Sequence, residues 1–169
     1  SLGFATHGLL DAATSFGTLL LWPFDNSRYS LSIISIVDPF FSIPIIILVG
    51  VGVIRRDGRW GRIALFWATT YLLAGAWQHQ LAMRAAQELA DQREHRPTRV
   101  TVKPTFGNII LWRSIYEADG HFYIDAIRPG PWKTKIKGTS VAKLDSARDF
   151  PWLDPRTTQA EDIKRFRQL

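Results

Sequence analysis

A histidine and a carboxylate stand four residues apart near the start of the chain, at His7 and Asp11. On a helix this spacing places both side chains on one face, close enough to share a metal ion or a water molecule. Imidazole and carboxylate suit Zn, Mn or Fe, and a hydrolytic site would keep one coordination position open for water. The same spacing also fits a hydrogen-bonded pair that neutralises two polar groups inside a helical bundle. Because ionisable groups are costly in an apolar segment, their presence there favours a functional site.

A third candidate is Asp38, which precedes Pro39 and a charge-free apolar run that ends at Arg55-Arg56. Its simplest interpretation is the N-cap of a helix that begins at Pro39. The alternative is catalytic, as a ligand or general base that reaches the site of His7 and Asp11. A single helix over residues 7–22 would be about 22 Å long and would separate His7 from Asp38. The catalytic alternative therefore requires a break in that helix or a folded-back loop.

Several other chemistries are excluded by what the sequence lacks. It contains no cysteine, which excludes disulfide scaffolds, Cys-based zinc sites and thiol nucleophiles. It contains no phosphate-binding loop, dinucleotide fingerprint, nucleophile elbow or nucleic-acid motif, so no nucleic-acid partner is expected. His79, in the sequence WQHQ, is typical of a membrane-interface position. Lysines 133, 135 and 137 alternate on a possible strand, either as a solvated edge or as a surface for anionic lipid headgroups.

The elements that must position these residues differ between the two halves of the chain. The mean hydropathy of −0.04 and the net charge of +6 are averages over an apolar half and a basic half. Three hydrophobic segments, at residues 2–22, 39–54 and 63–83, indicate membrane helices. The loop RRDGRWGR between the second and third segments carries four arginines, which predicts that it faces the cytoplasm.

From residue 98 the pattern changes to alternating strands. We expect strands over residues 98–104, 108–118 and 121–127, with Asp119-Gly120 in the hairpin turn between the last two. An edge strand at residues 133–138 and a final helix capped by Thr157 or Thr158 would follow. The predicted fold is thus membrane α-helical, with about three hydrophobic segments, followed by a small β-rich α+β soluble domain. Its divisions are a membrane region at 1–83, a helical linker at 84–97, and the soluble domain at 98–169, truncated at its C-terminus.

The order of short motifs resembles a family of bacterial, membrane-bound, metal-dependent hydrolases, typified by a LexA-regulated inner-membrane protein. The motifs that carry the resemblance are His7-x-x-x-Asp11, Thr14-Ser15-Phe16-Gly17-Thr18, Trp22-Pro23-Phe24, Arg28-Tyr29 and Asp38-Pro39. It continues into the second half through Pro104-Thr105, Asn108 and Leu111-Trp112-Arg113. The resemblance covers most of the chain, and the combined order is more specific than any single motif.

The resemblance implies a multi-pass protein of the bacterial inner (cytoplasmic) membrane, in contact with membrane lipid. It also implies a metal-dependent hydrolase in which His7 and Asp11 bind a divalent ion that activates water. Members carry an upstream His-Arg-Gly-x-Thr-His-Ser segment that this sequence lacks. We therefore expect a fragment with an incomplete metal site, inactive by itself. The alternative is a non-catalytic membrane protein whose soluble domain binds a partner or a lipid surface.

Overall fold

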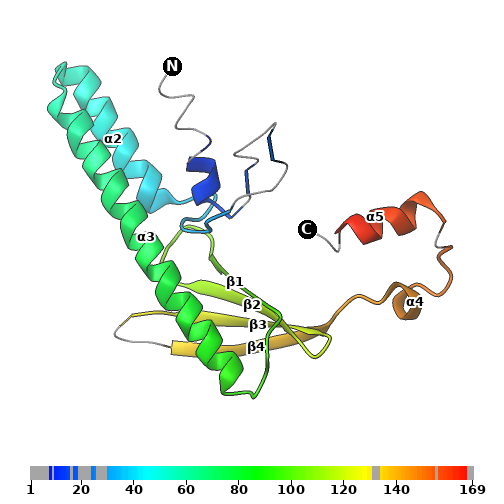
Figure 1. The fold of residues 1–169 in the computed structure, drawn as a ribbon. Coiled ribbons are helices and arrows are strands. Elements are labelled where there is room, and N and C mark those ends of the chain that lie inside the picture. Colours follow the sequence, from blue (N-terminus) through cyan, green and yellow to red (C-terminus); the bar gives the residue numbers. More distant parts are fainter. Residues whose placement is uncertain are drawn as a thin grey trace.

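One long helix joins a helical hairpin to a four-stranded sheet in the computed structural model (Figure 1). The structure describes residues 8, 10–15, 17–18, 24–25, 30–130, 134–154 and 156–166. The elements are α2 (Pro39–Arg55), α3 (Arg59–Asp91), β1 (Arg99–Pro104), β2 (Trp112–Ala118), β3 (His121–Arg128), β4 (Thr134–Ala142), α4 (Ser146–Asp149) and α5 (Thr158–Phe166). Helices α2 and α3 lie side by side, and the second half of α3 crosses the sheet.

Helix α2 begins and ends where its sequence predicts. The Asp38 carboxylate accepts a hydrogen bond from the Phe41 backbone N–H at 3.2 Å, and Pro39 occupies the first turn. Arg56 ends the helix in the left-handed conformation, with φ 52°, and its N–H returns to Gly52 and Val53. The predicted capping role of Asp38 is therefore confirmed.

The prediction of about three membrane-crossing segments is wrong for the part of the chain that the structure describes. None of the described helices is both long enough and apolar enough to span a bilayer. Helix α2 has 17 residues, about 25 Å at the α-helical rise and short of a ~30 Å hydrocarbon core. Helix α3 is longer, but its apolar run gives way to Gln78, His79 and Gln80 before it reaches the sheet. Most of segment 2–22 lies outside the described residues.

The sheet is an antiparallel meander in the order β1-β2-β3-β4. The predicted hairpin turn is confirmed, because Asp119 and Gly120 take the positive φ values of 50° and 71° that a tight β-hairpin requires. Strand β2 begins at Trp112, later than expected, because the Asn108 side chain binds the N–H groups of Ile110 and Leu111 in a turn. The predicted edge strand is confirmed as β4 and extends to Ala142.

Small residues of α3 form the helical side of the core. The predicted helical linker at 84–97 continues α3 to Asp91, and its alanines allow the helix to lie close on the sheet. The buried residues of the two layers are Ala82, Ala85, Ala86, Leu89, Ala90, Val102, Trp112, Tyr116 and Ile127. The strand residues among them share one face of the sheet by register. The opposite face of the sheet carries Arg99, Thr101, Lys103 and their neighbours and is not covered by α3.

A buried ion pair fastens the C-terminal end of α3 to the sheet. Arg93 donates to both carboxylate oxygens of Asp125, at 2.9 and 2.7 Å, and to the Tyr116 hydroxyl at 2.7 Å. The Gly138 N–H donates to the same carboxylate at 2.8 Å. Asp125 is 2% exposed, and its hydrogen bonds are the main reason that the pKa of Arg93 is raised. This arrangement satisfies every charge in the cluster, as a buried pair must.

Candidate functional site

The first two predicted site residues are only partly covered by the structure. His7 lies outside the described residues, and Asp11 lies half-buried in a helical stretch at residues 10–13. Within the described residues, no three His, Asp or Glu side chains lie close enough to hold a metal ion. The pairing of His7 with Asp11 and their role as metal ligands therefore stay predictions.

Asp38, the candidate catalytic residue, is held by protein contacts. Its side chain is 3% exposed, and the Tyr71 hydroxyl donates to its two oxygens at 2.9 and 2.8 Å. Burial, followed by this hydrogen bond, raises the pKa of Tyr71, so the phenol stays protonated as a donor. These contacts are those of a helix cap that also ties α2 to α3. A catalytic role for Asp38 stays a prediction.

Backbone hydrogen bonds join the segment with the most specific motif to residues 31–33, which pack on α3. The N–H groups of Leu31 and Ile33 donate to Ala12 and Ala13, each at 2.8 Å. Ile33 lies directly on Gly75 of α3, where an added Cβ would stand 2.8 Å from the Ile33 carbonyl oxygen. This close approach needs a residue without a side chain. It holds the Thr-Ser-Phe-Gly-Thr motif near the middle of α3.

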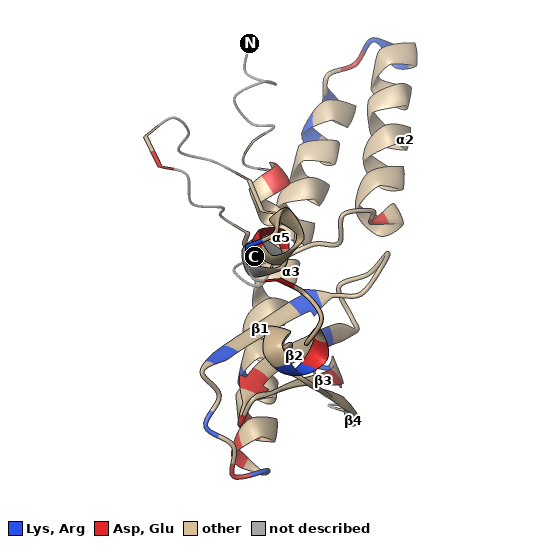
Figure 2. Cartoon of the chain, turned by 90° about the vertical axis from the view of Figure 1, so that its right-hand side faces the viewer, with Lys and Arg blue, Asp and Glu red and all other residues tan. Residues whose placement is uncertain are grey.

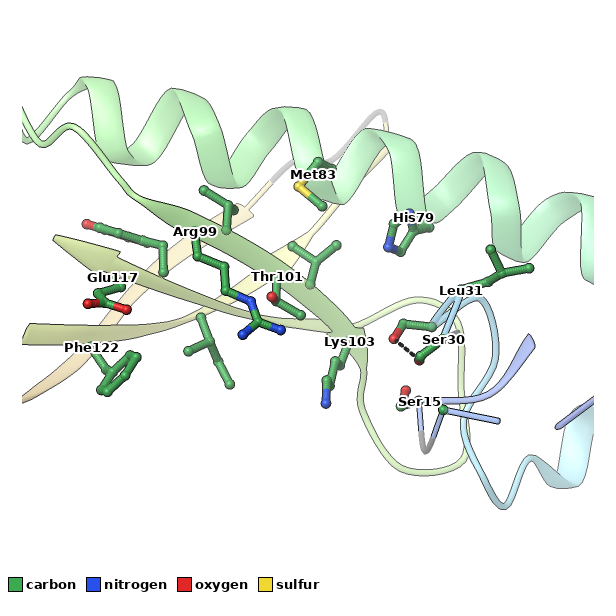
Figure 3. Close-up of a pocket in the computed structure, with 16 residues that line it drawn as sticks. Ser15, Ser30, Leu31, His79, Met83, Arg99, Thr101, Lys103, Glu117 and Phe122 are labelled. Carbon is green, nitrogen blue, oxygen red and sulfur yellow. Dashed lines mark hydrogen bonds between the residues drawn. The ribbon is translucent and has the colours of Figure 1, made fainter. Parts of the chain in front are cut away.

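A pocket of about 730 Å³ lies where this segment, α3 and strand β1 meet (Figure 3). Its N-terminal wall contains Ser15, Gly17, Ser30, Leu31 and Ser32. Helix α3 contributes His79 and Met83, and the sheet contributes Arg99, Val100, Thr101, Val102, Lys103, Ile115, Tyr116, Glu117 and Phe122. A volume of this size accommodates a small-molecule ligand.

The sheet wall of the pocket is basic. Arg99, Thr101 and Lys103 alternate along β1, so the three side chains leave the strand on one side, as Figure 3 shows. The acidic member of the pocket, Glu117, lies opposite Arg99 in the register and forms an ion pair with Lys143. Its charge is thus compensated from outside the pocket, and the cations of Arg99 and Lys103 dominate the interior.

The helical and N-terminal walls offer neutral polar groups. Burial lowers the pKa of His79, whose ring contacts Trp112 edge-on at 5.6 Å between centroids. The imidazole is therefore neutral at physiological pH and has one N–H to donate. The hydroxyl oxygens of Ser30 and Ser32 lie 3.1 Å apart. The Ser15 Oγ is buried with no hydrogen-bond partner among the described residues.

Sequence reasoning did not identify this pocket. The alternation in Arg-Val-Thr-Val-Lys was a usable signal, because on a strand it places two cations on one side. The approach of Ser15 and His79 to that strand depends on the docking of distant segments. The interpretation of His79 as an interface residue also left out its place beside Trp112.

The comparisons with known proteins bear on the N-terminal half. Residues 1–82 match the family model described as YdjM inner membrane protein. No curated protein and no solved structure matches the chain. The matched region includes Ser15, Ser30, Ser32 and His79 of the pocket, whereas β1 lies beyond it. The match agrees with the inner-membrane part of the resemblance and carries no information on metal binding or hydrolysis.

Proposed function

We propose that this protein acts at the inner membrane, with the α2–α3 hairpin as its lipid-contacting surface. The observation that carries this proposal is a row of large apolar side chains exposed along both helices. They are Phe40, Ile43, Ile46, Ile47, Val49, Val53 and Ile54 of α2, and Ile63, Leu65, Phe66, Leu73 and Trp77 of α3. Large apolar side chains exposed in this number on two neighbouring helices mark an interaction site.

The charges at the hairpin tip favour a lipid surface as the occupant. Arg55, Arg56, Arg59 and Arg62 surround the turn between α2 and α3, where Asp57 is the single acid (Figure 2). Arginines beside apolar residues suit a helix pair that lies in the membrane interface, with guanidinium groups at the phosphates. Trp67 and Trp77 belong to the residue type that concentrates at that level.

Vesicle flotation tests this proposal through matched substitutions. Ile46 and Ile47 are 69% and 58% exposed on α2, and Ile136 is 56% exposed on β4. We expect I46Q/I47Q to reduce the fraction bound to phosphatidylglycerol-containing vesicles several-fold, because two apolar side chains lose their lipid contact. The control I136Q should bind as the wild type does. Equal binding of I46Q/I47Q and wild type would refute a lipid-contacting hairpin.

Metal-dependent hydrolysis is a second candidate function, with an unidentified substrate. It is supported by the resemblance of residues 7–18 and by the position of Ser15 and Gly17 of that motif in the pocket wall. His7 and Asp11 would bind a divalent ion, Zn, Mn or Fe, which supplies an activated water when bound. The described donors alone do not complete a metal site, so no catalytic step is derived through the ion.

Metal content tests the ligand assignment directly. In the full-length protein, with the upstream histidine segment that the resemblance implies, we expect the metal bound per chain to fall at least several-fold in H7A and in D11N, because each removes a ligand. The control D119N changes an exposed turn carboxylate and should retain the wild-type metal content. Unchanged metal content in both H7A and D11N would reject the assignment. Circular dichroism of each variant separates loss of metal from loss of fold.

A further inference from the structure

Two cations of strand β1 reach the pocket without a partner of opposite charge. Arg99 and Lys103 form no ion pair with any described residue, while Glu117 beside them is bound to Lys143. Along β1 the two residues are four apart, with Thr101 between them on the same side. Lys103 is half-buried, and Arg99 is exposed. Because both cations line the same cavity, they indicate that an anionic ligand binds there and neutralises their charges.

We propose that the pocket binds the phosphate group of a small anionic molecule. The guanidinium of Arg99 and the ammonium of Lys103 supply charge-assisted donors from the sheet side. Thr101 on β1 and Ser15 on the N-terminal wall supply hydroxyl donors. The Ser30 hydroxyl already donates to the Thr14 carbonyl oxygen, so its contact with Ser32 uses the Ser32 proton. A phosphate accepts hydrogen bonds through several oxygens in different directions, so it can use donors from both walls at once.

The unpartnered hydroxyl of Ser15 is an independent observation in favour of this ligand. Its Oγ is buried and makes no hydrogen bond within the described part of the chain, although such groups are normally satisfied. Ser15 lies in the N-terminal wall, close to Ser30 in the view of Figure 3. A phosphate in the pocket would provide the missing acceptor.

The location of the pocket suggests where the phosphate comes from. If the α2–α3 hairpin contacts lipid as proposed above, a phospholipid headgroup is one source, and this part of the inference rests on that function. A free phosphate ester is the other source. Both present the same chemistry to Arg99 and Lys103, and the choice of probes distinguishes them.

Isothermal titration calorimetry at fixed ionic strength tests the site. The probes are inorganic phosphate, glycerol 1-phosphate and monomeric dihexanoyl-phosphatidylglycerol, each added to the full chain. We expect binding at one site per chain, weakened about ten-fold or more in R99Q/K103Q, because both charged donors to the phosphate are lost. The control R128Q/K137Q removes the same charge from exposed positions on β3 and β4 and should change affinity less than two-fold.

S15A adds a readout that a structural role would not move. Because the Ser15 hydroxyl has no partner among the described residues, its removal should leave the melting temperature unchanged or slightly raised. Phosphate affinity should nevertheless fall several-fold. Unchanged affinity in both S15A and R99Q/K103Q, equal weakening in R128Q/K137Q, or no binding of any probe would overturn the proposal.

The outcomes separate this site from the lipid-contacting hairpin. I46Q/I47Q should keep wild-type affinity for glycerol 1-phosphate even when vesicle binding is lost. Tighter binding of dihexanoyl-phosphatidylglycerol than of glycerol 1-phosphate identifies a lipid source, and equal or weaker binding identifies a free phosphate ester. Either result supports a phosphate site, whereas failure of flotation alone affects only the membrane proposal.

Discussion

At the scale of single residues, the strongest polar interaction is the one between Arg93 and Asp125. Replacing Asp125 by Asn leaves the buried guanidinium without its counter-charge, which should lower the free energy of unfolding by about 3 kcal/mol. The control E117Q breaks the more exposed pair with Lys143 and should cost less than about 1 kcal/mol. Urea denaturation of both variants measures the difference, and equal losses would contradict a clamp at the end of α3.

Residue-scale prediction from the sequence succeeded where the partner is local. Asp38 was predicted as a cap because an Asx-Pro pair before an apolar run needs only its own helix. The bond from Tyr71 to Asp38 joins residues 33 positions apart, and no local pattern indicates it. The same holds for Arg93 with Asp125, because neither residue has a distinguishing sequence neighbour. His7 and Asp11 remain predictions from spacing and resemblance.

At the scale of elements, two glycines test how closely β3 and β4 approach each other. Gly138 lies in β4, and Gly50 in α2 is its control. An added Cβ at Gly138 would stand 1.9 Å from the Ile124 carbonyl oxygen, beside the irregular register at Ile124 and Ala126. G138A must therefore displace backbone and should destabilise the protein by more than about 2 kcal/mol. At Gly50, inside α2, nothing lies within 4 Å of an added Cβ, so G50A should stabilise by up to about 1 kcal/mol. Thermal melts of both variants provide the measurement, and a lower melting temperature for G50A than for G138A would contradict this packing.

The types of the elements were predictable because each depends on the local spacing of apolar and polar residues along the sequence. The Asp-Gly turn and the alternating runs indicated the four strands, and the apolar run after Pro39 indicated α2. The membrane-crossing interpretation is wrong for the described helices because α2 is short and α3 becomes polar from Gln78 onwards. Helix α3 is a single helix that contains both the apolar residues of the hairpin and the alanines that pack on the sheet. The sequence indicates that continuation through its predicted helical linker at 84–97, and α3 extends to Asp91.

At the scale of the whole molecule, the match of residues 1–82 to an inner-membrane family model ends within α3, at Ala82. The pocket nevertheless uses residues from both sides of that limit, with His79 before it and Arg99 after it. The phosphate site therefore depends on the sheet as well as on the matched half. Helix α3 runs through the boundary between the predicted membrane region at 1–83 and the predicted helical linker at 84–97.

The unbroken course of α3 also sets a length. Its 33 residues extend about 50 Å at 1.5 Å per residue, and His79 stands about 30 Å from its first residue. The helix is continuous over this distance, so it separates the pocket from the arginines of the hairpin tip. If the hairpin rests on a bilayer, α3 acts as a rigid spacer, and the orientation of the hairpin fixes the height at which the pocket meets its ligand.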